Sequence, residues 1–316
     1  MNHYCTLFDS NYLSRGLAMY ESLKLQTTAF HLYIFAFDDK AYKLLTKLNL
    51  EFVTVISLEQ FEDEKLLSIK HTRGAGEYCW TCTPSTIKYC IETFKLDECT
   101  YLDADLYFFG DPAILIEEMG DKSILLTEHR YTPAYDQSST SGIYCVQFMT
   151  FKNTFDGMKA LNWWREACID WCFAHFEDGK FGDQKYLDDW TDRFEGVHVL
   201  QHLGGGVAPW NVQQYDLSSS RFELIFYHFH NFKFITKDKV ELGLYFLNKK
   251  NISLLYKPYV IHLQQISQMI QSLDSSSCYS GISGKKPFHW KDPIRVLKRK
   301  MKRIYNVYDT DFITKE

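Results

Sequence analysis

The first half of the sequence alternates short apolar runs with longer stretches in which apolar residues recur at helical spacing. This alternation limits the fold more than any other feature, because a strand–helix–strand unit returns the chain parallel to its first strand. Strands are expected at 4–8, 31–37, 52–56, 100–102 and 123–127. Helices are expected at 12–25, from Asp38 or Asp39 to Leu48, from an N-cap at Thr83 with Pro84 behind it to Phe94, and after Pro112. We therefore predict an α/β fold with a mainly parallel sheet flanked by helices.

The second half mixes the two patterns and contains no linker that would separate domains. Strands are expected at 143–148 and 223–229, and helices at 153–176 and 183–190. A chain of 316 residues buries a large core without disulfide or metal support. We predict one main domain over 1–235, followed by a C-terminal extension over 236–316.

Charge and composition exclude several protein classes. The formal net charge of −5 argues against a general nucleic-acid binder, which is expected to be basic. No apolar run reaches the roughly 18 residues of a membrane span, and the first residues lack the basic and apolar regions of a secretory signal. Nine cysteines, an odd number, predict free thiols in a reducing, cytoplasmic compartment. The pairs Cys79/Cys82 and Cys168/Cys172 lack further ligands at zinc-site spacing, so we interpret them as core residues.

The strongest chemical signal is Asp103-Ala104-Asp105, which follows an expected strand and has apolar flanks on both sides. Burying two carboxylates is costly unless the charges meet a cation. On an extended chain, residues two apart point to the same side, so both carboxylates can reach one hard divalent ion such as Mn²⁺ or Mg²⁺. Open parallel sheets bind ligands beyond the carboxyl ends of their strands, where this pair falls. Phosphotransferases with an aspartyl nucleophile fit less well, since they place Thr or Val where this chain has Tyr107.

With this motif the sequence resembles the GT-A glycosyltransferases, most of all the family-8 branch of glycogenin and LgtC-like galactosyltransferases or a bacterial relative of it. The stretch from Cys5 to Tyr12 is similar to the nucleotide-sugar-binding start of that family, and 141–146 resembles the strand beneath the donor sugar. Gly182-Asp183-Gln184 resembles the acidic-amide pair near the reacting centre, and Pro209-Trp210-Asn211 resembles a later Trp-Asn pair. The resemblance spans roughly residues 4–235.

The resemblance implies a Rossmann-type sheet that binds a nucleotide sugar, with the nucleotide part over 1–127 and the acceptor part over 128–235. It implies a nucleoside-diphosphate sugar donor, expected to be a UDP-sugar, and a retained anomeric configuration. The expected acceptor is a glycan or a lipid-linked glycan in surface polysaccharide synthesis. No nucleic-acid partner is expected.

Roles for single residues follow from the same resemblance. Asp103, Asp105 and a later His would hold the metal, and Asp183 and Gln184 would orient the acceptor or support the oxocarbenium-like centre. Lys88, or Arg73 in a short Gly-containing loop, would add positive charge beside the leaving diphosphate. The expected donor-binding residues are Thr6, Asp9, Tyr12, Arg73, Lys88, Asp103, Ala104, Asp105, Ser141 and Gly142, and the expected acceptor-binding residues are Trp210 and Asn211.

The sequence departs from the family where the domain is expected to end. The family often has a strand with a metal-ligand His, followed by Gly and Lys-Pro-Trp. Here Asn231 stands in the Gly position and Lys-Pro-Trp is absent. His228 and His230 lie on the same face of the expected strand, so the third metal ligand is open between them.

A basic segment lies near the C-terminus. The stretch 285–304 contains nine basic residues and one acidic residue, and its apolar residues fall near helical spacing. These apolar residues are Phe288, Trp290, Val296, Leu297, Met301 and Ile304. A basic amphipathic helix with aromatic anchors is typical of a protein on an anionic membrane surface, here the inner face of the membrane. A solvated terminal helix is the alternative interpretation.

Two other functions remain open at this point. A sugar nucleotidyltransferase has the same kind of sheet and similar acids, but it normally has a Gly-rich phosphate loop after the first strand, and 6–15 contains no Gly cluster. A catalytically inactive, transferase-like binding protein is the other alternative. The intact acidic pair and Gly182-Asp183-Gln184 argue against it.

Overall fold

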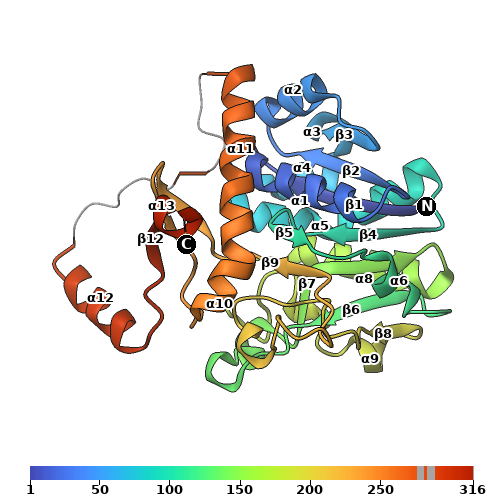
Figure 1. Cartoon of the computed structure of the whole chain (residues 1–316). Helices are drawn as coiled ribbons and strands as arrows, with labels where there is room; N and C mark the ends of the chain where they lie inside the picture. The colour runs from blue at the N-terminus through green and yellow to red at the C-terminus, as the bar shows by residue number, and fades with distance from the viewer. Residues whose placement is uncertain (276–280, 283–288, 316) are drawn as a thin grey trace.

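A seven-stranded sheet runs through the centre of the molecule in the order β3-β2-β1-β4-β7-β6-β8 (Figure 1). The computed structural model describes residues 1–275, 281–282 and 289–315. All neighbouring strands of this sheet are parallel except β7, which runs antiparallel to β4 and β6. The strands are β1 (Asn2–Phe8), β2 (Phe30–Ala36), β3 (Val53–Ser57), β4 (Glu98–Leu102), β6 (Ile124–Glu128), β7 (Tyr144–Lys152) and β8 (Val197–Val199).

Helices cover both faces of the sheet because successive residues of a buried strand point to opposite sides. Tyr4 and Phe8 of β1 belong to one apolar cluster, whereas Cys5 and Leu7 belong to the other. The first cluster contains residues of α1 (Leu13–Gln26), α2 (Asp39–Leu48) and α11 (Lys257–Leu273). The second contains residues of α3 (Leu58–Phe61), α4 (Glu64–Lys70), α5 (Ala75–Phe94) and α8 (Phe155–Asp170).

Pro84 lies inside α5, which corrects the helix start expected at Thr83. The helix begins at Ala75, where the Glu77 carboxylate accepts the Gly74 N–H at 2.7 Å. Pro84 has no N–H to donate, so α5 tolerates one missing internal hydrogen bond. The capping contact at Gly74 and the burial of the helix against the sheet outweigh the local N-cap signal at Thr83.

Other helix boundaries in the structure also differ from those expected from the sequence. The helix expected over 153–176 ends at Asp170, and the short helix expected over 183–190 is divided into a 3-10 turn (Lys185–Leu187) and α9 (Trp190–Arg193). The remaining short helices are α6 (Ala113–Glu117), α7 (Ser138–Ser141), α10 (Lys249–Asn251), α12 (Asp292–Met301) and α13 (Thr310–Lys315), with 3-10 turns at Pro133–Tyr135 and Val212–Gln214 and a π-helical turn at Ile252–Tyr256.

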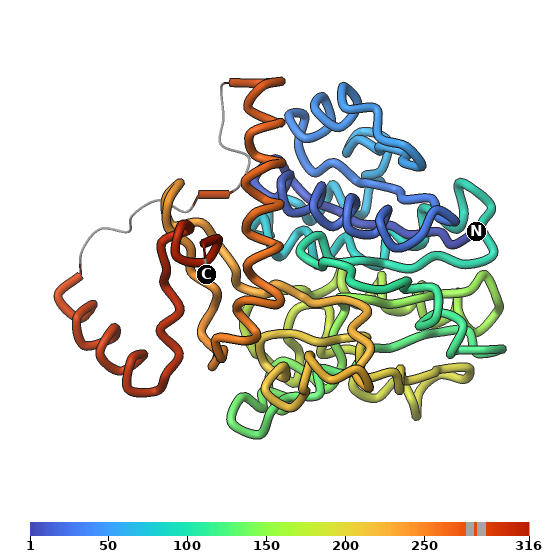
Figure 2. The backbone as a smooth tube through the Cα atoms, in the orientation of Figure 1, coloured from blue at the N-terminus to red at the C-terminus, as the bar shows by residue number. Residues whose placement is uncertain are grey.

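Two small sheets complete the fold. Strand β5 (Leu106–Phe108) pairs antiparallel with β9 (Phe226–His228), and β11 (Lys239–Glu241) pairs with β10 (Lys233–Thr236) and β12 (Val307–Asp309). Figure 2 shows α11 beside α1, with α12 set off at the left edge of the view. The eight cysteines in the described part of the chain are free thiols. Within the same residues, no helix has the length and apolar character needed to cross a membrane.

Candidate active site

A cavity of about 680 Å³, called here the central cavity, lies where β1 and β4 reach their carboxyl ends. It is lined by the loops that follow these two strands, by the first residues of β7 and by the end of β9. The lining residues include Asp9, Tyr12, Trp80, Asp103, Ala104, Asp105, Tyr131, Ser141, Asp183, Gln184, Trp210, His228, His230 and Tyr245. The parallel sheet brings the two loops to one edge, as expected for an open α/β sheet.

Three ligand-type side chains meet at this edge. Asp103, Asp105 and His228 have ligand atoms that all lie within 4.8 Å of one another. His228 Nε2 is 3.1 Å from Asp105 Oδ1 and 3.7 Å from Asp103 Oδ2. The antiparallel pairing of β5 with β9 places His228 opposite Leu106, one residue after Asp105. Of the two candidate histidines, it is therefore His228 that joins the carboxylates, while His230 Nε2 lies 2.8 Å from Asn231 Nδ2.

The orientation of His228 fits a metal ligand. Its Nδ1 lies 2.7 Å from Gln147 Oε1, an acceptor that is completely buried. An Nδ1–H that donates to this oxygen directs Nε2 toward the two carboxylates, where it can bind a metal ion once the ion replaces the Nε2 proton. Two carboxylates and one imidazole are a donor set suited to Mn²⁺, and to Mg²⁺ when water completes the shell.

Burial and mutual charge set the protonation of this group. Burial raises the pKa of Asp103 to about 6, with Asp105 as a further raising influence. Burial also acts to raise the pKa of Asp105, but the charge of His228 and its hydrogen bond outweigh burial and lower this pKa to about 2. The pKa of His228 is raised well above its ordinary value, because Asp105 outweighs the opposing effect of burial. The three side chains thus hold a positive charge between two carboxylates, the place that a cation would take.

Asp183 and Gln184 reach the central cavity from the loop after α8. The Trp164 indole N–H donates to the Asp183 carbonyl at 2.9 Å, and Gln184 Nε2 donates to the Ser141 carbonyl at 2.7 Å. Gly182 has a positive φ of 52°, a conformation that favours glycine. Burial raises the pKa of the Asp183 carboxyl to about 8, and the charge of Asp103 contributes.

The loop after β1 forms another wall of the central cavity. Asp9 and Tyr12 both line it, and the Asp9 carboxylate accepts the backbone N–H groups of Asn11 at 3.0 Å and Tyr12 at 3.1 Å. These contacts shape the turn into α1. The side chain of Thr6 is buried in β1 and does not line the cavity.

The two cations expected beside the diphosphate are not among the lining residues. Lys88 Nζ bonds Glu92 at 2.5 Å and Asn162 at 2.7 Å. The Arg73 guanidinium donates to the Ile169 carbonyl at 3.0 Å and lies over the Phe173 ring. Among the donor-binding residues expected on 141–142, Ser141 lines the cavity and Gly142 does not.

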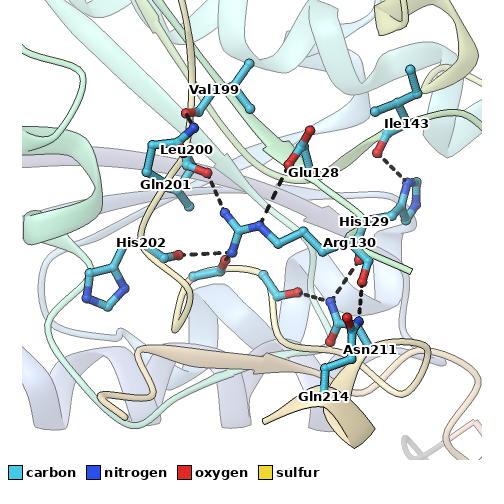
Figure 3. A network of polar contacts seen from close by, with 12 residues as sticks. Glu128, His129, Arg130, Ile143, Val199, Leu200, Gln201, His202, Asn211 and Gln214 are labelled. Atoms are coloured by element: carbon cyan, nitrogen blue, oxygen red, sulfur yellow. Dashed lines mark hydrogen bonds and ion pairs between the residues drawn. The ribbon is translucent and has the colours of Figure 1, made fainter. Parts of the chain in front are cut away.

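A network of polar contacts holds the loop that carries Trp210 (Figure 3). The indole N–H of Trp210 and the side-chain amide of Asn211 both donate to the His129 carbonyl at 2.8 Å. The neighbouring Arg130 guanidinium donates to the carbonyls of Leu200, His202 and Gly205. Trp210 is only 3% exposed. Asn211 is completely buried and does not line the cavity, whereas Trp210 lines it.

Sequence patterns missed several side chains of the central cavity. Trp80 is 36% exposed and lies 6.4 Å from Phe181, ring centre to ring centre, beside Gly182. Tyr131 and Tyr245 also line the cavity, and their ring centres lie 6.2 and 6.4 Å from that of Trp210. A lone aromatic residue on a helix or loop has no local signal that separates it from a core residue. Trp80 reaches the cavity from α5, whereas Tyr131 and Tyr245 pack in one apolar cluster with Trp210.

Comparisons with known proteins agree with this fold. No model of a known protein family matches the sequence. The chain is 32% identical over 285 residues to the uncharacterized protein YfnD of Bacillus subtilis (strain 168), covering 85% of this chain and 91% of YfnD. It is 28% identical over 298 residues to the uncharacterized protein YfnF of the same organism, covering 89% of this chain and 97% of YfnF.

Among solved structures, the chain is similar to the apo form of the glycosyltransferase GlyE of Streptococcus pneumoniae TIGR4. The TM-score is 0.50 at 13% identity, over 88% of this chain and 64% of that one. The likeness confirms the expected α/β architecture as a GT-A fold.

Proposed function

Because this chain belongs to the same protein family as Bacillus subtilis YfnD and has the GT-A fold, we propose that it is a metal-dependent glycosyltransferase. Its donor is a nucleoside-diphosphate sugar, a UDP-sugar, and its acceptor is a glycan or a lipid-linked glycan in surface polysaccharide synthesis. The configuration at the transferred sugar is retained, as in the family-8 enzymes that the sequence resembles. The observation that carries the proposal is the meeting of Asp103, Asp105 and His228 at the edge of the sheet.

The proposal assigns a role to each wall of the central cavity. Asp103, Asp105 and His228 would hold Mn²⁺ or Mg²⁺, and the ion would stabilise the negative charge of the leaving diphosphate. Asp9 and Tyr12 hold the nucleoside, and Ser141 and Ala104 contact the donor. Asp183 and Gln184 face the reacting sugar, with Asp183 buried enough to keep its carboxyl out of water. Trp80 and Trp210 bound the space left for the acceptor.

A nucleotidyltransferase is a weaker alternative. Such an enzyme needs backbone N–H groups and cations around a triphosphate. Within the described residues, the walls of the central cavity contain neither Lys nor Arg, and the turn after β1 contains no Gly. The inactive alternative shares every feature of the site and differs only in turnover.

A thermal-shift screen of nucleotide sugars with and without Mn²⁺ tests the function. We expect one UDP-sugar to raise the melting temperature by several degrees only when Mn²⁺ is present, because a ligand of the native state stabilises it. Slow Mn²⁺-dependent release of UDP from that sugar would then separate an enzyme from a binding protein. If no nucleotide sugar shifts the melting temperature in the presence of Mn²⁺, the proposal is wrong.

We also propose that α12 lies on the inner face of an anionic membrane. Its apolar residues form one exposed stripe, with Ile294 49%, Leu297 59% and Met301 76% exposed. Lys298 and Lys300 flank the stripe at helical spacing. Residues 285–288 lie outside the described residues, and Val296 and Ile304 are half-buried rather than part of the stripe.

One contact fixes the rotation of α12. Arg299, on the side of the helix away from the stripe, bonds Glu241 of β11 at 2.8 Å. The apolar stripe therefore faces away from Glu241, flanked by positive charge, on a helix that Figure 1 shows set off from the central sheet. This combination supports an interfacial helix more than a solvated one.

Replacing Leu297 and Met301 together by glutamate is expected to lower binding to phosphatidylglycerol vesicles about tenfold or more, since it removes apolar insertion and adds repulsion. Cosedimentation measures the bound fraction. The control is Leu25→Glu, an exposed leucine at the end of α1, which should leave binding unchanged. Equal binding of the double variant and the unmodified protein would refute the membrane role.

A further inference from the structure

The central cavity is short of positive charge for its proposed ligand. Its lining contains the carboxylates of Asp9, Asp103, Asp105 and Asp183 and, within the described part of the chain, no Lys or Arg. A nucleoside diphosphate brings further negative charge into this low-dielectric space. One divalent ion beside the carboxylates of Asp9, Asp103 and Asp105 leaves the bound state electrostatically unfavourable. A nearby cation would reduce this unfavourable electrostatic energy.

A smaller cavity of about 330 Å³ adjoins the central cavity and contains such a cation. The two cavities share Asn11, Tyr12 and Asn231 in their walls, so they are neighbours along one surface. The smaller one, called here the arginine cavity, is also lined by Arg15, Phe232 and Lys233, and by Gly281 and Ile282. Lys233 is already paired with Glu241 at 2.7 Å. Arg15 is the cation that remains.

Within the part of the chain that the structure describes, Arg15 is buried and has no carboxylate partner. It is 4% exposed, and its guanidinium carbon lies 4.2 Å from the centre of the Tyr12 ring. Its Nη2 donates to the Phe232 carbonyl at 3.1 Å. Among the described residues, no carboxylate oxygen lies within 4.0 Å of its nitrogens, although the chain pairs Arg130, Arg165, Arg193, Arg295 and Arg299 with acids. Buried charges are normally paired, so an unpaired one marks a place where an anion binds.

The surroundings of Arg15 connect it to the donor site. The Tyr12 ring that covers the guanidinium belongs to a residue lining both cavities. The carbonyl that orients it belongs to Phe232, two residues after His230 of the central cavity. Arg15 therefore contacts both the loop after β1 and the segment after β9, which border the group formed by Asp103, Asp105 and His228. A guanidinium has five N–H donors in a planar fork that matches phosphate oxygens.

We propose that Arg15 binds the diphosphate of the nucleotide-sugar donor from the arginine cavity and supplies the positive charge that the walls of the central cavity lack. The inference rests on the proposed function and assigns the leaving-group cation to Arg15 instead of Lys88 or Arg73. Its charge stabilises the diphosphate in the bound donor and, more strongly, as negative charge grows on it when the bond to the sugar breaks.

Calorimetry with UDP and with uridine, both in the presence of Mn²⁺, tests this assignment. Two neutral variants are made, since Arg15→Gln keeps a donor for the Phe232 carbonyl and Arg15→Met keeps an unbranched chain against Tyr12. Both are expected to weaken UDP binding about 10- to 100-fold, the loss typical of a hydrogen bond to a charged group, while uridine binding changes less than about twofold. Arg15→Lys should restore part of the UDP affinity, because it keeps charge without the fork.

The matched control is a substitution of Arg193. Arg193 also stacks on an aromatic ring, that of Trp163, but lies outside both cavities, so Arg193→Met should bind UDP as the unmodified protein does. The inference is wrong if the neutral Arg15 variants bind UDP normally, or if they lose uridine and UDP equally, which is the mark of a structural role. If the unmodified protein binds none of UDP, GDP, ADP and dTDP, the proposed function fails together with the inference.

Discussion

Replacement of Asp103 and Asp105 together by asparagine is expected to abolish Mn²⁺-dependent binding of UDP and to lower sugar transfer by on the order of 10³-fold. Asparagine keeps the size of each side chain but removes the two negative charges that face His228 Nε2. The remaining imidazole is a poor site for a hard divalent ion, which prefers charged oxygen ligands. Calorimetry of UDP with and without Mn²⁺ measures the binding, and release of UDP from the sugar nucleotide measures turnover.

The matched control is Asp121→Asn, which neutralises an exposed carboxylate far from the cavity lining. Circular dichroism establishes that both proteins fold. Uridine alone should still bind to the double variant, because Asp9 and Tyr12 are unchanged. Mn²⁺-dependent UDP binding that survives in the double variant would show that the metal lies elsewhere and would remove the basis of the proposed mechanism.

A single substitution at Asp183 is expected to change both the activity and the stability of the protein. We expect Asp183→Asn to lower transfer about 10²- to 10³-fold while UDP binding stays within about threefold, because the Asp183 side chain acts at the reacting sugar rather than on the nucleotide. The same variant should be more stable than the unmodified protein. Burial raises the pKa of Asp183 to about 8, so the folded protein holds a proton that the unfolded chain has already released.

The direction of the pKa shift of Asp183 determines the pH range over which the stability of the protein changes. In the metal-free protein, the unfolded chain ionises Asp183 near the ordinary value of 3.8, whereas the native state does so near 8. Stability is therefore lost as pH rises between these two values, and the full loss is present above pH 8. Asparagine cannot ionise, so the gain in melting temperature of Asp183→Asn should be small near pH 5 and grow to a plateau above pH 8.

Melting curves from pH 5 to pH 9 measure this difference. Asp192→Asn, an exposed acid on α9, provides the control and should show no pH-dependent gain. A gain that is the same at every pH would mean that Asp183 is ionised throughout. A variant that keeps full transfer activity would exclude Asp183 from the reaction.

Local patterns alone predicted much of the architecture. Apolar runs at 4–8 and 31–37, separated by a stretch with helical spacing, predicted parallel strands in a sheet flanked by helices, and the structure contains both features. Asp38 caps α2 by accepting the Ala41 N–H at 2.6 Å. Such features depend on residues within a few positions of one another, so the sequence itself displays them. Pro84 marks the limit, since the same local signal occurs inside a longer helix.

The acidic pair was equally visible, because two charges between apolar neighbours at the end of a strand are anomalous wherever the strand lies. The side chains that surround the acidic pair could not be identified from the sequence. His228 and His230 share one strand face, and only the pairing of β9 with β5 brings His228 to Asp105. The Gln147 acceptor that orients His228 is 81 residues away in the chain.

The cations show the same division most clearly. Lys88 and Arg73 looked suitable by sequence order, yet both have partners outside the central cavity, whereas Arg15 lies buried beside it. By itself the sequence determined the order of the functional features along the chain. These are an apolar scaffold and carboxylates that stand where strands end. Only the tertiary structure decided which His, Arg and Trp side chains lie at or beside the central cavity, because those contacts depend on strand pairing and helix rotation between segments far apart in sequence.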